Sequence, residues 1–326
     1  MKTVVEPTSS PKEQAQAISR ALTLLRAGDV VALPTETVYG LAADALAAAA
    51  VVKIFETKER PRFDPLIVHL PNRGWLRRVA TASKLAEALL EKFWPGPLTI
   101  LLPKTNLIPD IVTAGLPTVA LRMSAHPIFS AIVRELDRPL AAPSANRFGR
   151  ISPTAAAHVL EELDGRIPLI VDGGATEHGL ESTIVAVQEN RLTILREGPV
   201  TREQLAEFAE VSVARRSSAR PTAPGQLPSH YAPHTPLTVV ENLASFEIPA
   251  GRRYGALVWS DAPVPASFVE SRRLSTSSDL REAATNLFRE LRALDAAGLD
   301  GLVAEATPEN SLGAAIMDRL RRAAHR

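Results

Sequence analysis

The segment Val30–Gly40, VVALPTETVYG, constrains the fold of this chain more than any other stretch. Four apolar residues lead into Pro34 and then into three polar side chains at 35–37, which is typical of a buried strand that runs into a polar turn. In an open α/β sheet, ligands bind beyond the carboxyl ends of the strands. The segment therefore predicts either a binding site at a strand end or a proline-initiated turn whose threonines bind only backbone groups.

The same pattern, an apolar run that ends in hydroxyl or charged side chains, recurs along the chain. We expect further strands at residues 65–70, 98–102, 118–123, 139–142, 170–174 and 192–195. Arg122 is a full charge in one of these apolar runs, which is costly unless a carboxylate or a bound anion pairs with it. His69, near the end of another run, is either a hydrogen-bonded structural residue or part of a site. So many polar strand ends favour a binding site over isolated turns.

Helix start and stop signals lie between these strands. Ser10, Pro11 and Glu13 form a capping box that opens a helix, and Gly28 ends it. Further helices are expected at residues 44–57 and 83–92, after Ser152-Pro153, and after Thr201. The helix after Ser152 would offer its free amide groups to an anion. Strands that alternate with helices predict an α/β fold.

Four basic residues lie within ten positions at the end of the helix predicted at 44–57. They are Lys53, Lys58, Arg60 and Arg62. Such a run is either a solvated helix end or a local anion site. The chain has 37 basic and 36 acidic side chains, so bulk charge does not hold it to a nucleic acid. Any site for a polyanion must be a local cluster.

The composition limits the class of protein. At 326 residues the chain is long enough for two domains, and 45% hydrophobic with 22% charged residues is typical of a globular protein. The sequence has no cysteine, which excludes disulfides, thiolate zinc sites and cysteine nucleophiles. It has no run of 18 apolar residues and no signal-peptide h-region, so we expect a cytoplasmic protein.

The composition changes between residues 209 and 236, where arginine, serine and proline are typical of a linker. His230 and His234 lie in this stretch, but Pro233 argues against a helix that would bring them to one face, so no metal site is predicted. Beyond the linker, strands are expected at 237–240, 254–259 and 301–304, and helices at 279–297 and 308–324. This part predicts a small alternating α/β domain.

The sequence lacks the phosphate-binding loops GxxxxGK[ST] and GxGxxG and the catalytic motifs HExxH and GxSxG. What remains is a set of hydroxyl, cationic and imidazole side chains without an obvious covalent nucleophile. The set is Thr37, Thr118, Ser144, Ser152, Ser182, Lys58, Arg60, Arg122, Arg196 and His69. Guanidinium groups bind phosphate or carboxylate in a fork, and hydroxyls fix orientation. The set therefore favours a polyphosphate bound beside a small zwitterion, and adenylyl transfer rather than triad hydrolysis.

Nine short motifs also follow one another in a fixed order. They are PTETVYGL at 34–41, KERPRFDPLIVH at 58–69, WPGPLT at 94–99, VALRMSAHP at 119–127, APSAN at 142–146, SPT at 152–154, ESTI at 181–184, LREGP at 195–199 and HYAPHTP at 230–236. Over essentially the whole chain they resemble the two-domain form of the L-threonylcarbamoyladenylate synthase family. The resemblance implies a YrdC-type α/β domain at 1–208, with a twisted open sheet and a concave, locally cationic groove. It also implies a linker at 209–236 that closes over the groove and a small Rossmann-like α/β domain at 237–326.

The resemblance further implies a reaction. It is that of a nucleotidyltransferase that makes L-threonylcarbamoyladenylate and pyrophosphate from L-threonine, bicarbonate and ATP, with Mg²⁺ present. The product supplies the threonylcarbamoyl group of the tRNA adenosine next to the anticodon. The implied partners are these substrates and a downstream tRNA threonylcarbamoyl transferase complex, without a membrane and without tight direct binding to nucleic acid.

Carried over by motif, the resemblance implies two groups of contacts. Those to threonine are Thr37, His69, Arg122 and Ser182, with Arg122 on the carboxylate. Those to ATP are Lys58, Arg60, Asp64, Thr118, Ala142, Ser144, Ser152, Arg196 and, in the linker, Tyr231. No catalytic residue is implied.

Asp64 departs from the family pattern, which has asparagine, or histidine in single-domain relatives, before the PLIVH strand. A carboxylate near a triphosphate is repelled unless a magnesium ion lies between them. We therefore expect Asp64 either to coordinate magnesium, the interpretation we favour, or to weaken nucleotide binding.

Two other functions are weighed against this one. A double-stranded RNA-binding module would use the same cationic groove for a phosphate backbone, and steep loss of binding with salt would reveal it. Near-zero net charge and hydroxyls at strand ends favour a small-molecule site instead. A carbamoyltransferase subdomain resembling the hydrogenase-maturation enzyme is disfavoured, because its metal-rich flanking domains would require cysteines.

Overall fold

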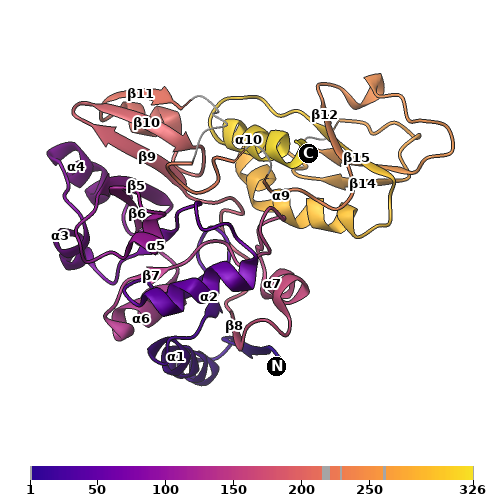
Figure 1. The fold of residues 1–326 in the computed structure, drawn as a ribbon. Helices are drawn as coiled ribbons and strands as arrows, with labels where there is room; N and C mark the ends of the chain where they lie inside the picture. The colour runs from indigo at the N-terminus through magenta and orange to yellow at the C-terminus, as the bar shows by residue number, and fades with distance from the viewer. Residues whose placement is uncertain (1, 215–220, 228–229, 260–261, 326) are drawn as a thin grey trace. The chain divides into compact units, whose positions relative to one another are not determined.

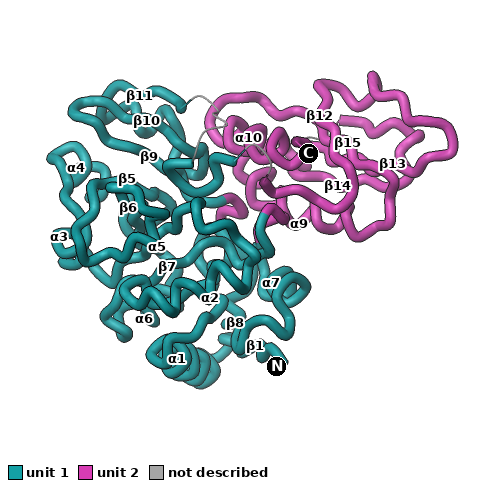
Figure 2. The backbone as a smooth tube through the Cα atoms, in the orientation of Figure 1, with its two compact units in different colours: residues 1–148, 153–177, 181–227 teal, residues 149–152, 178–180, 228–326 magenta. Residues whose placement is uncertain are grey.

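The computed structural model describes residues 2–214, 221–227, 230–259 and 262–325 (Figure 1). They fall into two compact units, which Figure 2 shows in different colours. Unit 1 comprises residues 1–148, 153–177 and 181–227, and unit 2 comprises residues 149–152, 178–180 and 228–326. Two short stretches from earlier in the chain thus group with unit 2. The linker predicted at 209–236 includes residues 215–220 and 228–229, which lie outside the described residues.

Unit 1 is built on a mixed sheet of eleven strands among its described residues. The strands are β1 (Val4–Pro7), β2 (Val31–Leu33), β3 (Gly40–Asp44), β4 (Ile67–His69), β5 (Leu98–Pro103), β6 (Thr118–Arg122), β7 (Leu140–Ala141), β8 (Leu169–Asp172), β9 (Thr183–Gln188), β10 (Arg191–Arg196) and β11 (Glu210–Val213). Across the sheet their order is β1-β8-β2-β3-β7-β4-β6-β5-β9-β10-β11. Parallel pairs such as β4 with β6 stand beside antiparallel pairs such as β5 with β6. Because many neighbours are not consecutive, residues far apart in sequence meet side by side.

Helices and short turns of helix connect these strands. They are α1 (Pro11–Arg26), α2 (Ala48–Lys58), η1 (Arg73–Trp75), α3 (Leu76–Val79), α4 (Lys84–Phe93), α5 (Asp110–Thr113), α6 (Pro127–Leu136), α7 (Ala156–Leu163) and α8 (Arg202–Ala206). The predicted capping box is present, because the Glu13 amide donates to Ser10 Oγ and the Ser10 amide donates to the Glu13 carboxylate. The buried residues of α1 recur every three or four positions, so this helix buries a single face.

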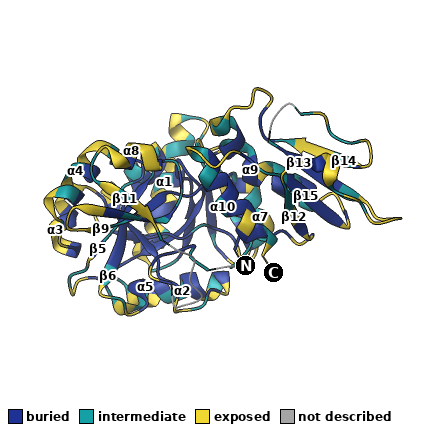
Figure 3. Ribbon diagram, turned by 90° about the horizontal axis from the view of Figure 1, so that it is seen from above, coloured by how far each residue is buried: buried dark blue, intermediate teal, exposed yellow. Residues whose placement is uncertain are grey.

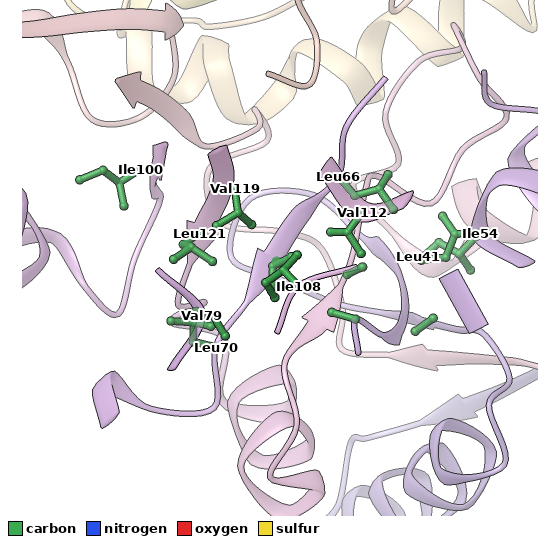
Figure 4. Packing of buried hydrophobic residues seen from close by; sticks show 14 of the residues in the cluster. Leu41, Ile54, Leu66, Leu70, Val79, Ile100, Ile108, Val112, Val119 and Leu121 are labelled. Carbon is green, nitrogen blue, oxygen red and sulfur yellow. The ribbon is translucent and has the colours of Figure 1, made fainter. Parts of the chain in front are cut away.

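Helices cover one face of the sheet from β8 to β10. Strand residues on this face alternate with residues on the other, and they pack against helix residues in one large cluster. Figure 4 shows part of it, in which Leu41 of β3 lies next to Ile54 of α2, and Val112 of α5 lies next to Leu66. This apolar layer holds the sheet in place.

On the opposite face, the described helices of unit 1 pack over one half. There, α1 and α6 pack on β2, β3, β7 and β8 in a second cluster that includes Leu140. On the other half lies a small cluster of Ile67, Ala120, Ile184 and Ala223, from β4, β6, β9 and the predicted linker. The strands that carry this open half are β4, β6, β5, β9 and β10.

Unit 2 contains a parallel sheet of four strands among its described residues. They are β12 (Leu237–Val240), β13 (Tyr254–Val258), β14 (Glu270–Arg273) and β15 (Gly301–Glu305), in the order β12-β15-β13-β14. Its helical elements are η2 (Leu243–Ser245), α9 (Leu280–Asp295) and, after the last strand, α10 (Leu312–Ala324). The predicted class, a large twisted α/β sheet with a second small α/β domain, is confirmed. Across the described ranges, every helix is too short or too polar to cross a membrane.

Two of the helix starts predicted in the amino-terminal half of the chain are wrong. The helix predicted from residue 44 begins at Ala48, because Asp44 still belongs to β3 and pairs with Leu140 of β7. The alanines from residue 48 onward do form the helix, as their propensity indicates. Ser152 caps no helix, since α7 begins at Ala156 after an extended Ala155.

Other differences concern the carboxyl-terminal part. The last helix begins at Leu312 rather than at Pro308. The strands β11 and β14 were not expected, because their sequences lack an apolar run. Both have mostly exposed or half-exposed side chains, and β11 is visible as an exposed edge in Figure 3. Pairing with a neighbouring strand, rather than burial of side chains, defines them.

Candidate active site

His69 and Arg122 lie next to each other on the open half of the sheet. They are register partners in the parallel pair of β4 and β6, so their side chains point to the same face. His69 also pairs with Leu140 of β7, which belongs to the cluster under α1 and α6. The His69 ring contacts Phe129 of α6, with 4.7 Å between ring centroids. The two residues therefore stand where the helix cover of this face ends.

The polar turn after β2 brings two side chains to Arg122. Arg122 Nη2 donates to Glu36 Oε1 at 2.7 Å and to Thr37 Oγ1 at 2.9 Å. The Ser124 hydroxyl donates to the other oxygen of Glu36. Thr35 Oγ1 accepts a hydrogen bond from the Thr37 amide, which fixes the turn. Thr35 thus binds the backbone of the turn, whereas the Thr37 hydroxyl contacts the Arg122 guanidinium.

The ion pair between Glu36 and Arg122 is almost completely buried, with 4% of each side chain exposed. Burial alone would raise the pKa of Glu36, but the Arg122 charge and hydrogen bonds from Ser124 and Arg122 outweigh it and lower the pKa to about 2. Glu36 is therefore ionised at neutral pH. It is the carboxylate that offsets the charge which Arg122 brings into an apolar strand.

His69 is neutral at physiological pH. Burial, and next the Arg122 charge, lower its pKa to about 3, although Glu36 acts in the opposite direction. Its Nδ1 has no hydrogen-bond partner among the described residues. A neutral imidazole here presents a flat, weakly polar surface beside the guanidinium group.

Ser182 lies immediately before β9 and is held from two sides. Its hydroxyl is 2.7 Å from the Thr99 hydroxyl of β5. Arg196 Nη2 donates to its carbonyl oxygen at 2.9 Å and to its hydroxyl at 3.1 Å. The segment after β10 comes close to the start of β9, and Gly198 allows this because a Cβ there would lie 2.5 Å from the Thr183 amide nitrogen. The Ser182 hydroxyl is thus fixed between a hydroxyl and a guanidinium.

Lys58, at the end of α2, forms hydrogen bonds with the loop after β7. Its buried Nζ donates to the carbonyl oxygen of Ser144 at 2.6 Å and to that of Asn146. Ser144 is in turn bridged to Gly40, the first residue of β3. Burial, and next the Arg60 charge, hold the pKa of Lys58 well below its ordinary value.

Arg60 and Asp64 form a second buried ion pair, in the loop between α2 and β4. Arg60 Nη2 lies 2.9 Å from Asp64 Oδ2 and donates to the carbonyl oxygen of Pro65 at 2.8 Å. Arg60 Nε donates to the carbonyl oxygen of Asp64 at 3.2 Å. The guanidinium group is therefore turned toward its own loop.

Most predicted site residues of unit 1 lie along the open half of the sheet, in two groups. The predicted threonine contacts Thr37, His69 and Arg122 meet at the carboxyl ends of β4 and β6. The predicted ATP contacts Arg60, Asp64 and Thr118 lie toward the amino ends of the same strands. Ala142, also predicted for ATP, lies between the two groups, where its amide donates to the carbonyl oxygen of Ile67. Arg196, predicted for ATP, binds Ser182, predicted for threonine, and so connects the two groups.

Ser152 and Tyr231, also predicted to contact ATP, belong to unit 2. Both side chains are buried. The Tyr231 ring stacks on Phe288 with 5.5 Å between centroids, and the Arg319 guanidinium lies 5.2 Å from its centroid. Tyr231 thus packs in an aromatic and cationic cluster of that unit.

The sequence interpretation missed Glu36, Ser124, Thr99 and Asn146 as partners of the site residues. Each lies in one of the nine motifs, and membership of that motif was the signal that could have marked the residue as part of the site. Glu36 and Arg122 are 86 positions apart, and Thr99 and Ser182 are 83 apart. Such pairings follow from strand order and cannot be derived from local sequence.

A mixed sheet that presents buried ion pairs, an imidazole and fixed hydroxyls on one open half-face defines a small-molecule-binding α/β protein. A family model described as telomere recombination, for Sua5, YciO and YrdC proteins, matches residues 23–198. A second, the C-terminal domain of threonylcarbamoyl-AMP synthase, matches residues 200–325. The chain belongs to the threonylcarbamoyl-AMP synthase family, whose members are nucleotidyltransferases.

Individual relatives agree over the full length. The threonylcarbamoyl-AMP synthase of Bacillus subtilis is 41% identical, over 94% of this chain and 92% of its own. That of Pyrococcus abyssi is 39% identical, over 92% and 91%. The crystal structure of P. abyssi Sua5 complexed with L-threonine matches with a TM-score of 0.91 and 39% identity, over 99% of this chain and 98% of that one. The family predicted from nine motifs is confirmed.

Proposed function

We propose that the chain forms L-threonylcarbamoyladenylate and pyrophosphate from L-threonine, bicarbonate and ATP. The full-length likeness to threonylcarbamoyl-AMP synthases supports this activity. The observation that carries it is the row of side chains on the open half of the sheet, where the sites predicted for an amino acid and for a triphosphate adjoin. The product would supply a downstream transferase complex that modifies tRNA, in the cytoplasm where these substrates occur.

Arg122 is suited to the carboxylate of threonine. Its Nη2 is occupied by Glu36 and Thr37, whereas its Nη1 forms no hydrogen bond with a described residue. Nη1 would bind the carboxylate, and Thr37 would add a hydroxyl beside it. Because Glu36 offsets the Arg122 charge, this contact depends on the direction of the hydrogen bonds more than on net charge.

His69 and Ser182 would fix the rest of the amino acid. A neutral His69 does not repel the ammonium group, which must lose its proton before it can bind carbon dioxide or bicarbonate. The Ser182 hydroxyl, held by Thr99 and Arg196, would orient the threonine side chain. Positioning of this kind supplies much of the rate in reactions that need no covalent enzyme intermediate.

The chemical step joins the two groups of residues. The threonine amine and bicarbonate give a carbamate and water, and a carbamate oxygen attacks the α-phosphorus of ATP while the bond to pyrophosphate breaks. Lys58, Arg60 and Arg196, with the hydroxyls of Thr118, Ser144 and Ser152 and with Ala142 and Tyr231, are proposed to hold the nucleotide. The basic groups would balance the charge of the departing pyrophosphate.

Protein-held magnesium does not fit the residues present. Within the described ranges no group of three or more His, Cys, Asp or Glu side chains could hold a metal ion. The Asp64 side chain is fully buried against a guanidinium. Mg²⁺ would accordingly enter as part of the Mg·ATP substrate.

The domain limits 1–208, 209–236 and 237–326 remain our proposal, with the middle segment as a cover for the site. Ala223 of that segment packs against Ile67 and Ala120, on the face that carries His69 and Arg122, which supports the idea. A lid of this kind would exclude water from the reactive adenylate.

A pyrophosphate-release assay tests the proposed function. Release should require ATP, threonine and bicarbonate together, and the adenylate should be detectable by mass spectrometry. Release of pyrophosphate without any amino acid would contradict the assignment. An equal rate of release when serine replaces threonine would contradict it too. Turnover that persists in moderate salt would also count against a role in binding an RNA backbone.

A further inference from the structure

Asp64 is the most unusual charge of the site. Its side chain is fully buried, and Arg60 Nη2 lies 2.9 Å from its Oδ2. Neither carboxylate oxygen has a hydrogen-bond partner among the described residues. A buried carboxylate that lacks hydrogen bonds is costly, so the charges around it must account for its presence.

Arg60 pairs with this carboxylate, and the charges of Lys58 and Arg196 act on it from two other elements. Lys58 ends α2, Arg60 lies in the following loop, and Arg196 ends β10. Burial raises the pKa of Asp64, and the charges of Arg60, Lys58 and Arg196 act against that rise. The same three side chains are those proposed to hold the phosphates of ATP.

The magnesium role that the sequence suggested for Asp64 does not fit this geometry. A magnesium ligand needs an oxygen that can reach a hydrated ion, and it should not already face a guanidinium. The Asp64 carboxylate is enclosed and paired with Arg60. Of the two expected roles, weaker nucleotide binding is therefore the one that fits.

We propose that Asp64 is an internal counter-ion that holds Arg60 in place and lowers the affinity of the site for triphosphate and pyrophosphate. The inference rests on the proposed function and deepens it. Arg60 binds the loop through Asp64 and through the carbonyl oxygens of residues 64 and 65, so its orientation is set before substrate arrives. The negative charge of Asp64 then opposes the phosphates, which promotes release of pyrophosphate after the reaction.

The test is the substitution Asp64→Asn, which keeps the size of the side chain and one oxygen for Arg60 but removes the charge. Isothermal titration with ATP alone and with pyrophosphate alone compares it with the wild-type protein. We expect both ligands to bind about three- to tenfold more tightly to the variant. Equal or weaker binding of pyrophosphate to the variant would overturn the proposal.

Asp44→Asn provides a matched control. Asp44 pairs with Arg138 at 2.5 Å in the same unit. Asp44 is the last residue of β3. The residue of β3 that is bridged to Ser144 of the site is Gly40, at the opposite end of the strand. This variant should bind both ligands as the wild type does. If it bound them as tightly as Asp64→Asn, the effect would belong to net charge and the proposal would fail.

Steady-state kinetics separate a positioning role from a structural one. In Asp64→Asn the KM for ATP should fall, the KM for threonine should stay unchanged, and inhibition by pyrophosphate should strengthen. A rise in both KM values together would indicate general disruption and contradict the proposal. Asp64→Ser, which also removes the charge, should shift pyrophosphate affinity in the same direction and serves if the asparagine variant does not fold.

The titrations also keep this inference distinct from the proposed function. If both proteins bound pyrophosphate but neither bound ATP, the synthase assignment would fail while the pyrophosphate comparison would still decide the role of Asp64. If ATP turnover were normal and the two proteins bound pyrophosphate equally, the function would stand and the counter-ion would not.

Discussion

Arg122 Nη2 lies 2.7 Å from Glu36 Oε1, and this ion pair is almost completely buried although 86 positions separate the two residues. The protein itself thus supplies the carboxylate that stabilises Arg122 in an apolar strand. Loss of either partner alone would leave a buried charge without its counter-ion.

The substitution Arg122→Ala should affect both threonine binding and stability. We expect a loss of about 2 to 5 kcal/mol in threonine binding and of about 3 to 5 kcal/mol in the free energy of unfolding, because Glu36 becomes unpaired. The double variant Arg122→Ala with Glu36→Gln should recover most of the stability but not the binding. Urea unfolding and threonine titration measure the two effects. Normal threonine affinity in the stable double variant would contradict the role of Arg122.

Glu36 should make folding stability depend on acid pH. Its pKa is lowered from 4.5 to about 2 on folding, so its stabilising contribution is complete above about pH 4.5 and is lost as the pH falls toward 2. The contribution amounts to about 3 kcal/mol. Urea unfolding between these pH values should show a smaller decline in Glu36→Gln than in wild type. The exposed Glu91→Gln in α4 is the control, and an equal decline in all three proteins would refute the prediction.

His69 should stay neutral well below its ordinary pKa. Because folding lowers its pKa from 6.5 to about 3, stability from this group is complete above pH 6.5 and falls as the pH drops toward 3. The NMR signal of its imidazole, assigned with His69→Gln, should therefore not shift between about pH 8 and pH 5. A titration within that range would show that His69 is charged in the folded protein.

Thr99→Val should weaken threonine binding without unfolding the protein. It removes the hydroxyl 2.7 Å from Ser182 Oγ and leaves Arg196 as the remaining partner of that group. We expect the KM for threonine to rise by about five- to tenfold, which corresponds to one hydrogen bond, with the KM for ATP little changed. Thr193→Val is the matched control, because it breaks a similar hydroxyl pair with Ser212 between β10 and β11. An equal effect from both variants would argue against a site role for Thr99.

Gly198→Ala should disrupt the approach of β10 to the start of β9. The added Cβ would lie 2.5 Å from the Thr183 amide nitrogen and 2.6 Å from the Glu181 carbonyl oxygen, both rigid backbone atoms. Displacement of Ser182 and Arg196 should lower activity at least about tenfold and reduce the melting temperature by several degrees. Gly74→Ala in η1, where a Cβ would meet only the Asn72 side-chain oxygen at 3.0 Å, controls for loss of a glycine. Unchanged activity in Gly198→Ala would contradict the need for this contact.

Some local structure could be predicted because local rules decide it. The capping boxes at Ser10 and Thr201 form as their sequences indicate, and strands such as 237–240 and 118–122 lie where apolar runs place them. The helix expected at 44–57 forms but begins only at Ala48, because Asp44 ends β3 and pairs with Leu140 of β7. Strand pairing thus decides where this helix begins, while local propensity decides that it forms.

The sequence by itself determined the family, the alternating α/β elements and the chemical types of the site residues, since motifs and apolar spacing are local properties of the chain. Only the tertiary structure decided that Glu36 is the partner of Arg122, that Thr99 holds Ser182, and that Asp64 pairs with Arg60. The first two contacts join side chains more than 80 positions apart, and the third depends on complete burial. The physical reason is that strand order and burial, which decide which charges meet and which lose water, come from the packing of the whole sheet.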